Sequence, residues 1–586
     1  MRQWMVAAKK ADFYVIAEKF HVDPVVARII RNREVIGEKN IRIYLGGNLS
    51  DLSDPHQMKD MDRLVEILAQ KIRKQVHIRI IGDYDVDGVT SSHLFLTALR
   101  RVGAKVDVVI PHRIQDGYGL SLHLLQQAKE DGVDTILTCD NGIAAIDEIA
   151  WAKAQKMTVL VTDHHAVPFE EHEGRRTEKK SLADAVVNPH QQDCGYPYKE
   201  LCGAGVAWNV IRVLYENYDM DKREAEDLLD FVAMATVCDV MSLTGENRIL
   251  VKEGLKRIRH TKNIGLQALM QACNVQPENI SAYHFGYVLG PCVNATGRLD
   301  TARHALRLFE TGQETEAEEI ARDLVDLNQE RKELTLQGVE MAKKLCEEGG
   351  YENDPVLVLF LPDVHESIAG LIAGRIREMY NRPVFVLTRG EEGVKGSGRS
   401  TENYSMYENM CGCAELFTKF GGHPMAAGLS LPEENVEKFR RKINENCPLT
   451  VEEVCPDIHI DMAMPVGYAS TELVHQFALL EPFGKDNPSP LFADRNLSIS
   501  RMWVIGKNRN VLRMSVLSEY GQPVPVIFFG DVETLFAYFT EKFGQEEVEN
   551  ALHGRKNRIF FSMVYTAKID FYQGNENLQL EMKYYR

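Results

Sequence analysis

Residues 76–188 alternate short apolar runs with amphipathic stretches, and this rhythm constrains the fold more than any other feature of the chain. Strands are predicted at Val76–Ile81, Lys105–Ile110, Val133–Thr138, Met157–Thr162 and Ala185–Asn188. Helices are predicted near Thr90–Arg101, Leu122–Asp131 and Ala144–Gln155. Strands that alternate with helices form βαβ units, so we predict an α/β fold with a doubly wound parallel sheet.

Acidic and histidine residues follow these strands. The motifs are Asp83-Tyr84-Asp85-Val86-Asp87-Gly88, Asp140-Asn141-Gly142 and Asp163-His164-His165, and an apolar helix at Ala233–Cys238 runs into Asp239. Ligands of such sheets bind beyond the carboxyl ends of the strands. Like charges about 4 Å apart repel by roughly 4 kcal/mol per pair at an effective dielectric of ~20. Two divalent ions would nearly neutralise the five aspartates Asp83, Asp85, Asp87, Asp140 and Asp239, so the pattern predicts a two-metal site.

The first motif places carboxylates at alternate positions, which share one face while a strand stays extended. Gly88 is expected to permit a sharp turn into a helix at Val89. Taken alone, this motif could be a solvated acidic turn, and adjacent histidines are often incidental. Their occurrence at strand ends of one sheet favours a site.

The rest of the chain divides by pattern. Residues 200–310 are predicted to be mostly helical, and the charged stretch from Glu314 to about Glu348 is predicted to be one connecting helix. A second α/β unit follows, with strands at Pro355–Leu361 and Pro383–Leu387 around a helix at Glu366–Tyr380. From about residue 457, period-2 runs such as Val511–Val516, Val524–Phe529 and Ile559–Val564 indicate a small β-barrel or sandwich. Near the start, Asp23 and Pro24 predict the beginning of a short helix that extends through Ile30.

Bulk properties limit the class of protein. A length of 586 residues is too long for one core. We find no apolar run long enough to span a membrane and no signal-peptide pattern at the start. The 11 cysteines are scattered and odd in number, which favours reduced thiols and a cytoplasmic location. The net charge of −17 argues against bulk coating of nucleic acid but leaves a nucleic-acid enzyme open.

Three arginines stand in settings that suit phosphate. Arg113 follows a strand end, Arg298 lies in an asparagine- and glycine-rich segment, and Arg399 is flanked by small residues that include Ser397. The guanidinium group matches phosphate geometry with two parallel hydrogen bonds. Ordinary surface arginine is the alternative, above all for Arg113. Gly421-Gly422-His423-Pro424 is either a tight turn that lets a nucleic-acid backbone come close or a purely structural turn.

The C-terminal region interleaves basic and aromatic residues: Arg501, Trp503, Lys507, Arg509, Arg513, Arg555, Lys556, Arg558, Phe560 and Phe561. Aromatic platforms in cationic grooves bind single strands by stacking. Adjacent strand residues face opposite ways, so at most one of Phe560 and Phe561 is expected to face nucleic acid, and a barrel core is the alternative for both. On the long helix, Asn328 and Arg331 are expected on a solvated or interdomain face.

The sequences DYDVDG, TCDNG, TDHH and ATVCDV resemble the four motifs of the DHH phosphoesterase superfamily. GPCVNATGRL at 290–299, SGRS at 397–400, GGH at 421–423 and EPFGKDNP at 481–488 narrow the resemblance to the RecJ family of bacterial exonucleases, which degrade single-stranded DNA 5′→3′. The resemblance covers roughly residues 50–586. Cys292 and Thr296 stand where the family more often has arginine and alanine or glycine, and Asp486 replaces a common glycine.

The resemblance implies roles for individual residues. The metal ligands would be Asp83, Asp85, Asp87, Asp140, His164 and Asp239, with Asp140 bridging and His165 just outside them, near the scissile phosphate. Asp140 and His165 would thus be catalytic. A set of oxygens with one imidazole suits two Mn²⁺ or Mg²⁺ ions better than zinc. Arg113, Ser397 and Arg399 would hold the terminal 5′ phosphate, Arg298 an internal phosphate, and His423 a phosphate or base.

The resemblance also implies a domain order. It comprises a DHH catalytic domain (51–312), a connecting helix (313–350), a DHH-associated α/β domain (351–452) and an OB-like β-barrel that binds nucleic acid (453–586). Residues 1–50, which the resemblance does not cover, are expected to form an N-terminal helical extension. The expected function is removal of 5′-mononucleotides from single-stranded DNA in recombination and repair, by a monomer that works with a single-strand-binding protein and a helicase and not at a membrane.

Two other functions stay open at this point. One is a DHH phosphodiesterase acting on short oligonucleotides or cyclic dinucleotides, although its members usually lack a C-terminal β module. The other is a catalytically silent nucleic-acid-binding scaffold, although no expected ligand is missing. An inorganic pyrophosphatase is the least favoured, because it needs neither the arginines nor a barrel.

Overall fold

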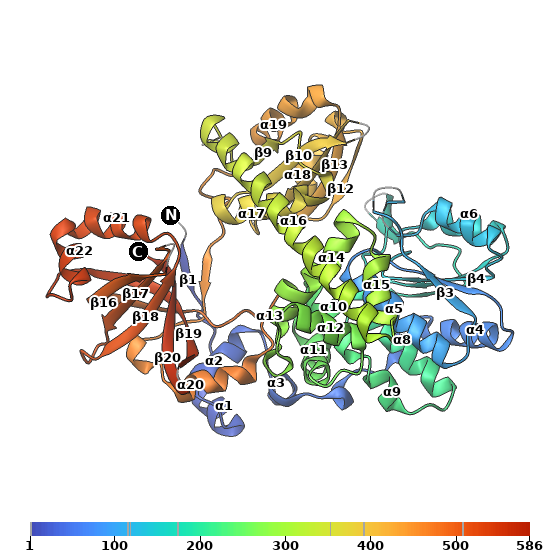
Figure 1. Ribbon diagram of the computed structural model, residues 1–586, viewed down its shortest axis with the longest axis horizontal. Helices are drawn as coiled ribbons and strands as arrows, with labels where there is room; N and C mark the ends of the chain where they lie inside the picture. The colour runs from blue at the N-terminus through green and yellow to red at the C-terminus, as the bar shows by residue number, and fades with distance from the viewer. Residues whose placement is uncertain are drawn as a thin grey trace. The chain divides into compact units, whose positions relative to one another are not determined.

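The computed structural model describes residues 3–113, 116–117, 119–172, 175–351, 353–390, 393–506, 509–572 and 574–586. They form two compact units (Figure 1). The first unit contains Leu52–Met241 and Glu246–Pro456. The second contains Gln3–Asp51, Ser242–Gly245 and Asp457–Arg586. Segments from both ends of the chain therefore build the second unit.

The first unit begins with the predicted parallel sheet. Its strands are β2 (Ile78–Ile81), β3 (Val106–Val109), β4 (Thr135–Cys139), β5 (Thr158–Thr162) and β8 (Ala185–Val187), in the order β3-β2-β4-β5-β8. Helices α4 (Met61–Arg73), α5 (Val86–Arg101) and α8 (Gly203–Asn217) cover one face, and α6 (Leu122–Glu130) and α7 (Ile146–Ala154) cover the other. Every residue of β2 and β4 is buried, as expected for strands with helices on both faces. The doubly wound sheet is confirmed. The hairpin β6 (Phe169–His172) and β7 (Arg175–Glu178) was not predicted.

The first acidic motif differs from its prediction. Helix α5 begins at Val86, because the Asp85 carboxylate accepts a hydrogen bond from the Gly88 amide (3.1 Å) and caps the helix. The predicted helix start at Val89, and with it an extended chain through Asp87, is wrong. Gly88 lies in the first turn, where a Cβ atom would come within 2.4 Å of the Asp83 backbone. The glycine therefore serves close packing of the helix against the strand end.

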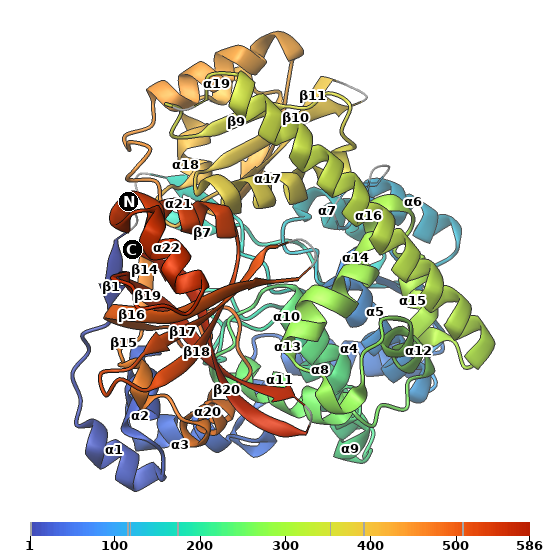
Figure 2. The same cartoon turned by 60° about the vertical axis from the view of Figure 1, so that its left-hand side comes forward.

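A helical region follows, as predicted. Its elements are α9 (Lys222–Glu226), α10 (Leu229–Cys238), α11 (Gly245–Ile258), α12 (Ile264–Ala272), α13 (Ala282–His284), a π-helical turn η4 (Phe285–Leu289), α14 (Gly290–Leu299) and α15 (Arg303–Glu310). The connecting helix α16 is confirmed at Glu314–Glu348. It packs on α12 and α14 and then reaches α17 (Glu366–Tyr380) (Figure 2). Asn328 on α16 is buried at 4% exposure, so the predicted solvated face is wrong for this residue.

The second α/β sheet has the order β12-β13-β11-β10-β9. Strands β9 (Leu357–Phe360) and β10 (Val384–Gly390) are parallel and were predicted, as was α17. Strands β11 (Gly393–Arg399), β12 (Lys419–Gly422) and β13 (Ala426–Leu431) are antiparallel and were missed. They are rich in glycine and have few large apolar residues, and only the short β13 shows alternate burial, at Ala427, Leu429 and Leu431. This second α/β region also contains helices α18 (Met406–Cys411) and α19 (Val436–Glu445).

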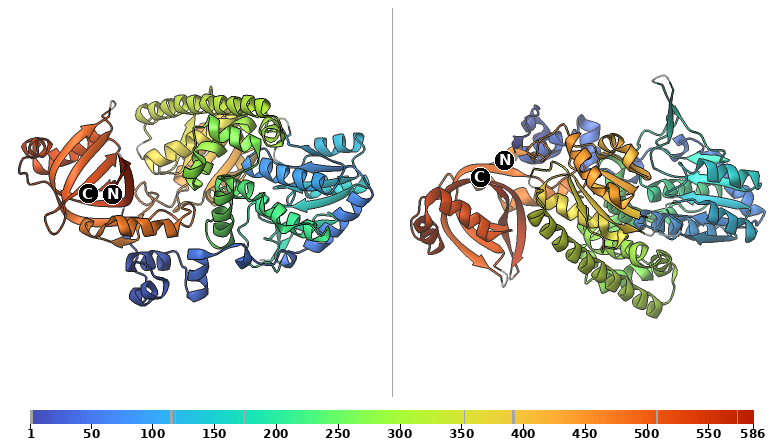
Figure 3. Two further views of the ribbon diagram at one scale, coloured as in Figure 1. Left: turned by 60° about the horizontal axis from the view of Figure 1, so that its bottom comes forward. Right: turned by 90° about the horizontal axis from the view of Figure 1, so that it is seen from above.

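The second unit is built around a β-barrel, as the period-2 runs predicted (Figure 3). The six-stranded sheet has the order β15-β16-β17-β18-β20-β19, and an additional pairing of β16 with β19 closes it. The strands are β15 (Met462–Ala463), β16 (Phe492–Ile505), β17 (Val511–Leu517), β18 (Pro523–Phe529), β19 (Phe560–Tyr572) and β20 (Asn575–Tyr585). Helices α20 (Thr471–Phe477), α21 (Val532–Phe543) and α22 (Gln545–Leu552) are also present, and β1 (Trp4–Val6) pairs with β14 (Ile458–Ile460).

The N-terminal segment belongs to the barrel's core. It contains α1 (Phe13–Phe20), α2 (Pro24–Asn32) and α3 (Glu38–Gly46), and apolar residues of all three helices join one buried cluster with barrel residues. The predicted cap is confirmed, because the Asp23 carboxylate accepts from the Val25 amide at 2.7 Å. A buried ion pair between Arg33 and Asp461 (2.7 Å) joins the segment to the sequence before the barrel.

The EPFGKDNP motif forms a turn in this unit, and the Asn487 side chain of the turn is buried. The Asn487 side chain accepts from the Tyr44 hydroxyl (2.8 Å) and donates to the carbonyls of Leu480 and Pro482 (2.8 Å each). Asp486 has a φ of 59°, in the left-handed region that glycine favours. Asp486 therefore adopts the left-handed conformation that the family's more common glycine would adopt at this position.

We expect Asn487→Ala to destabilise the second unit, because two carbonyls and a hydroxyl would lose their buried partner. Leaving a buried polar group unsatisfied costs about 1–3 kcal/mol. Thermal unfolding followed by circular dichroism should show a lower Tm. The neighbouring change Asp486→Gly should leave the Tm unchanged or raise it. An unchanged Tm in Asn487→Ala would contradict the role of this side chain.

Candidate metal centre and phosphate pocket

Asp140 lies at the carboxyl end of β4, where the backbone holds it in an unusual conformation. Its φ is 61°, in the left-handed region, and its side chain is buried. Gly203, the first residue of α8, packs on it so closely that a Cβ atom would lie 2.6 Å from the Asp140 Cβ. The Asn141 amide donates to the carbonyls of Ile81 (3.0 Å) and Cys139 (2.9 Å). These two hydrogen bonds link the end of β2 to the end of β4 next to Asp140.

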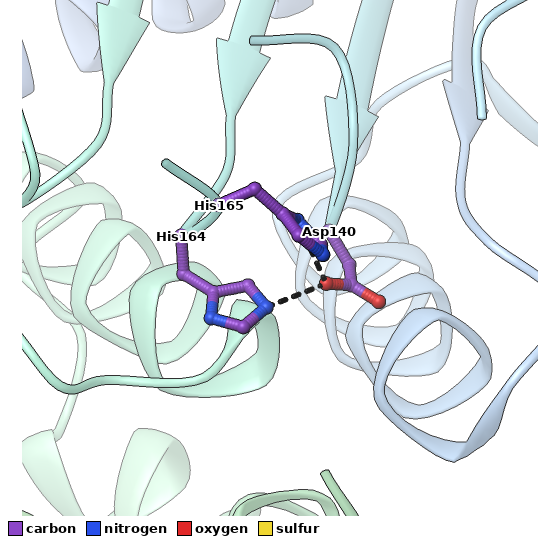
Figure 4. A group of neighbouring side chains, drawn as sticks. All are labelled: Asp140, His164 and His165. Carbon is purple, nitrogen blue, oxygen red and sulfur yellow. Dashed lines mark ion pairs between the residues drawn. The ribbon is translucent and has the colours of Figure 1, made fainter. Parts of the chain in front are cut away.

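His164 faces Asp140 from the end of β5 (Figure 4). Its Nε2 lies 3.1 Å from Asp140 Oδ1 and 3.6 Å from carboxylate oxygens of Asp87 and Asp239. Burial lowers the pKa of His164 to about 3, with a smaller contribution from the charge of His165. His164 is therefore a neutral imidazole, which is the form that binds metal.

Helix N-termini hold two of the other carboxylates. Asp87 accepts from the amides of Gly203 (2.6 Å) and Ala204 (2.7 Å), which begin α8, and Asp85 caps α5. The positive end of each helix dipole favours the ionised carboxylates. Burial and then the charge of Asp85 nevertheless raise the pKa of Asp87 to about 6.

Asp163 organises the histidine pair. Its Oδ1 accepts from the amides of His164 (2.7 Å) and His165 (3.0 Å) and lies 2.8 Å from His165 Nδ1, while Oδ2 accepts from the Ile143 amide (2.9 Å). Burial would lower the pKa of His165, but the hydrogen bond and charge of Asp163 raise it to about 9. His165 is half-buried, and its Nδ1 lies 3.9 Å from Asp140 Oδ1. The sequence analysis assigned no role to Asp163, although this residue is the first of the Asp163-His164-His165 motif.

The residues fit divalent metal. Within each of three groups the donor atoms lie within 4.8 Å of one another: Asp83, Asp85 and Asp140; Asp87, His164 and Asp239; and Asp140, His164 and His165. Burial, reinforced by neighbouring aspartates, raises the pKa values of Asp83 and Asp140 well above the ordinary range. Asp83 Oδ1 is buried and has no hydrogen-bond partner within the described residues. The structure thus brings together all six residues proposed as ligands, and a cation is the chemical complement that such a cluster requires.

A pocket of about 450 Å³ lies in the same unit. Tyr84 and Arg113 line it from segments that follow β2 and β3, and Ser367 of α17, Ser397 of β11 and Gly421 of β12 are among the residues that line it from the second α/β region. The Arg113 guanidinium stacks over the Tyr84 ring at 4.9 Å. An ion pair between Lys395 and Glu366 (2.8 Å) also borders the pocket. The arrangement suits an anionic group beside an aromatic face.

The other two predicted arginines border this region. Arg399 donates to the Gly398 carbonyl (2.7 Å), and a Cβ atom at Gly370 would lie 2.8 Å from its Nη2. Arg298 donates to the Ser367 carbonyl (2.7 Å). Burial lowers the pKa of both guanidinium groups, and that of Arg298 falls to about 9; the charge of Arg113 contributes to both shifts. Mutual repulsion of three cations makes the cluster receptive to phosphate.

His423 is exposed in the turn between β12 and β13 and does not line the pocket. Its amide donates to the Ala426 carbonyl (2.8 Å). Gly422 has a φ of 153° and a Cβ atom there would meet the Ala426 carbonyl oxygen at 2.5 Å, so glycine is required. The motif therefore forms a strand end and an exposed hairpin turn, and the contact of His423 with nucleic acid stays a prediction.

In the second unit, the predicted alternation on β19 is confirmed. Phe561 is buried (3% exposed) and Phe560 is exposed (58%). Trp503 is partly exposed on β16, and the Arg501 guanidinium lies 5.6 Å from its ring centre. Lys507 lies outside the described residues.

Comparison with known proteins decides the family. Models of the DHH family N-terminal domain, the DHHA1 domain and the RecJ OB domain match residues 77–236, 353–447 and 460–584. The single-stranded-DNA-specific exonuclease RecJ of Haemophilus influenzae is 32% identical over 581 residues, which are 96% of each chain. The chain belongs to the RecJ family. The RecJ resemblance and the fold class predicted from the motifs are confirmed.

Two further RecJ proteins extend the comparison. RecJ of Bacillus subtilis is 33% identical over 511 residues, which are 86% of this chain but only 63% of that relative. The crystal structure of RecJ in complex with Mn²⁺ from Thermus thermophilus matches with a TM-score of 0.81 at 25% identity, covering 100% of this chain and 79% of that one. No helix among the described residues has the length and apolarity needed to cross a membrane.

We expect Mn²⁺ to stabilise this RecJ-family protein, and more strongly at pH 7 than at pH 4.5. The folded-state pKa of Asp87 is raised to about 6, whereas an aspartate in an unfolded chain has a pKa near 3.9. Between these values the unfolded chain binds fewer protons, so metal-free protein loses stability as pH rises from about 4 to 6. Bound metal would offset this loss.

Thermal unfolding with and without Mn²⁺ at several pH values measures the effect. Asp140→Asn should raise the Tm of metal-free protein, because it removes one charge from the cluster, and should reduce the Mn²⁺ increment. A Tm increment that is equal at both pH values and in both proteins would exclude this cluster as the metal site.

Proposed function

We propose that this RecJ-family chain is a metal-dependent exonuclease that degrades single-stranded DNA 5′→3′ to 5′-mononucleotides, in recombination and repair. The observation that carries the proposal is the joint presence, in one unit, of a buried acidic and histidine cluster and an arginine-bordered pocket. The named relatives are single-stranded-DNA-specific exonucleases, which supports the same activity.

Asp83, Asp85, Asp87, Asp140, His164 and Asp239 would hold two Mn²⁺ or Mg²⁺ ions. When bound, such ions lower the pKa of water and stabilise charge on the attacking and leaving oxygens. Asp140 belongs to a donor group with Asp83 and Asp85 and to another with His164. It is therefore the carboxylate best suited to bridge both ions.

His165 would hold a proton beside the scissile phosphate. The Nδ1 atom of His165 is hydrogen-bonded to Asp163, and Nε2 is the ring nitrogen that would act on substrate. With a pKa of about 9, the imidazole is protonated near neutral pH. A protonated Nε2 can donate a hydrogen bond to a phosphate oxygen or give its proton to the leaving oxygen.

Arg113, Ser397 and Arg399 would bind the terminal 5′ phosphate, and Arg298 an internal one. Tyr84 beside Arg113 would stack on the terminal base, because its ring borders the same pocket. His423 would contact the strand from the β12–β13 turn. A pocket that accepts a terminal 5′ phosphate would select the 5′ end of a DNA strand. This selection would make degradation proceed 5′→3′.

We also propose that the domains run as 1–50, 51–312, 313–350, 351–452 and 453–586. The barrel would bind the strand away from the reacting end, with Trp503 and Phe560 as stacking surfaces, since each exposes an aromatic ring. The protein would act in the cytoplasm as a monomer, with a single-strand-binding protein and a helicase as partners.

We expect Asp140→Asn to abolish cleavage while single-strand binding persists, because the variant would lose the carboxylate that bridges both ions. Strands labelled at either end, incubated with Mn²⁺, Mg²⁺ or chelator, measure rate and polarity together. Asp147→Asn, the same chemical change on an exposed first turn of α7, is the matched control. Normal cleavage by Asp140→Asn would overturn the metal assignment, and cleavage of dinucleotides alone would favour the short-oligonucleotide phosphodiesterase. Strand binding without cleavage by the wild type would favour the silent scaffold.

We expect Arg399→Ala to cost most on strands that bear a 5′ phosphate. A hydrogen bond to a charged group contributes about 1.5–3 kcal/mol, or roughly ten- to a hundredfold in kcat/KM. Strands with a 5′ hydroxyl lack the full interaction and should lose less. The control is Arg389→Ala, an exposed arginine of β10 that pairs with Glu433 (2.9 Å) and does not line the pocket. An equal loss of kcat/KM on both substrates would indicate that Arg399 binds an internal phosphate instead of the terminal one.

A further inference from the structure

Two thiols that the proposed mechanism does not use lie in contact. Cys273 ends helix α12 and Cys292 lies in the first turn of α14, and their Sγ atoms are 3.8 Å apart. Both are free thiols. Cys273 is partly exposed, whereas Cys292 is buried at 2% exposure. Cys273 is therefore the member of the pair closer to solvent, and the buried sulfur of Cys292 is in contact with it.

The surroundings give the two thiols different chemistry. The hydrogen bond from Cys292 holds the pKa of Cys273 below its ordinary value against the opposing effect of burial, and the charge of Lys332 acts in the same direction. The same hydrogen bond and burial raise the pKa of Cys292. A partly exposed thiol with a lowered pKa, in contact with a buried second thiol, is the arrangement of a redox-sensitive cysteine pair.

Side chains of α16 fix the buried member of the pair. The Asn328 amide donates to Cys292 Sγ at 3.3 Å, and the Arg331 guanidinium donates to Asn328 Oδ1 at 3.1 and 2.8 Å. Asn328 is itself buried, so this network cannot reorganise into solvent. A change at Cys292 is transmitted to the position of α14 between α12 and α16.

Helix α14 connects the thiols to the candidate site. Asn294 Oδ1 accepts from the Val86 amide (3.2 Å) at the start of α5, beside Asp85 and Asp87. Gly297 packs so tightly that a Cβ atom would lie 2.4 Å from the Tyr84 carbonyl oxygen. Arg298 lies six residues beyond Cys292, or about 9 Å along the helix at 1.5 Å per residue. A shift of α14 would therefore disturb both the metal cluster and the phosphate pocket.

We propose that Cys273 and Cys292 form a reversible disulfide under hydroperoxide stress, and that this disulfide lowers the activity of the adjacent site by moving α14. The sulfurs would have to approach from 3.8 Å to about 2.05 Å. The regulatory part of this proposal rests on the proposed exonuclease function. The modification itself rests on the thiol geometry alone.

The chemistry balances with one molecule of hydrogen peroxide as oxidant. The Cys273 thiolate attacks the peroxide oxygen, the O–O bond breaks, and the leaving hydroxide takes up a proton to become water, which leaves a sulfenic acid. Cys292 then attacks the sulfenic sulfur, forming the S–S bond as its own proton and the sulfenic hydroxyl leave as a second water. A dithiol reductant reverses the step by thiol–disulfide exchange.

The experiment uses the full chain, reduced, freed of reductant and treated with hydrogen peroxide. Peptide mass spectrometry after alkylation should find a Cys273–Cys292 crosslink in the wild type and in Cys411→Ser, which removes an exposed thiol elsewhere. The crosslink should be absent from Cys273→Ser and Cys292→Ser, and dithiothreitol should reverse it. Because the wild type alone shows formation and reversal, a variant that fails to fold does not affect this test. Absence of the crosslink would overturn the proposal.

Two readouts test the effect on the site. Cleavage of 5′-phosphorylated strands should fall about tenfold on oxidation and recover with dithiothreitol, as expected for loss of a charge-assisted contact. The Mn²⁺-induced rise in Tm, measured without DNA, should also shrink. A crosslinked protein with unchanged cleavage and an unchanged Mn²⁺ response would overturn the regulatory role. Inactive reduced protein would instead refute the proposed exonuclease, while the Mn²⁺ response would still decide whether the disulfide reaches the site.

Discussion

Repulsion among carboxylates at one sheet edge is the constraint on which the rest of this structure depends. Asp83, Asp87 and Asp140 are buried together, with Asp85 and Asp239 beside them. The fold reduces the cost with the N-termini of α5 and α8, but the raised pKa values show that this compensation is incomplete. A site left with excess negative charge is suited to cations, and the arginine cluster beside it is suited to the phosphates that those cations would activate.

Helix α14 links most of the features described above. Its Asn294 anchors the start of α5, its Gly297 allows the Tyr84 backbone to approach, and its Arg298 donates to the Ser367 carbonyl in α17. The same helix carries Cys292 and packs on α16. Because these contacts are hydrogen bonds between side chains and backbone together with close packing, they tolerate little displacement. This arrangement is the basis of the proposal that a chemical change at one end of α14 affects the other end.

Periodicity predicted the elements whose apolar residues recur regularly. The five parallel strands were predicted from short apolar runs that alternate with helical stretches, and the predicted ranges of α16 and α17 agree with the structure. The period-2 runs near the C-terminus predicted a barrel or a sandwich, and the structure has the barrel. The glycine-rich strands β11–β13 were missed because glycine carries no side chain to mark a face, and α21 and α22 because they interrupt a region of strands. The start of α5 was placed three residues late because Asp85 was interpreted as a strand residue rather than a cap.

The sequence by itself determined the family, the fold class and the set of candidate ligands, because carboxylates, imidazoles and arginines at fixed places in a βαβ rhythm have few other uses. Only the tertiary structure decided how these groups act on one another. It assigned Asp163 to orient His165, placed Gly203 against Asp140, joined the N-terminal helices to the barrel core and brought Cys273 to Cys292. Each of these depends on distances between residues far apart in the chain or on side-chain orientation, and neither local propensity nor spacing encodes such distances.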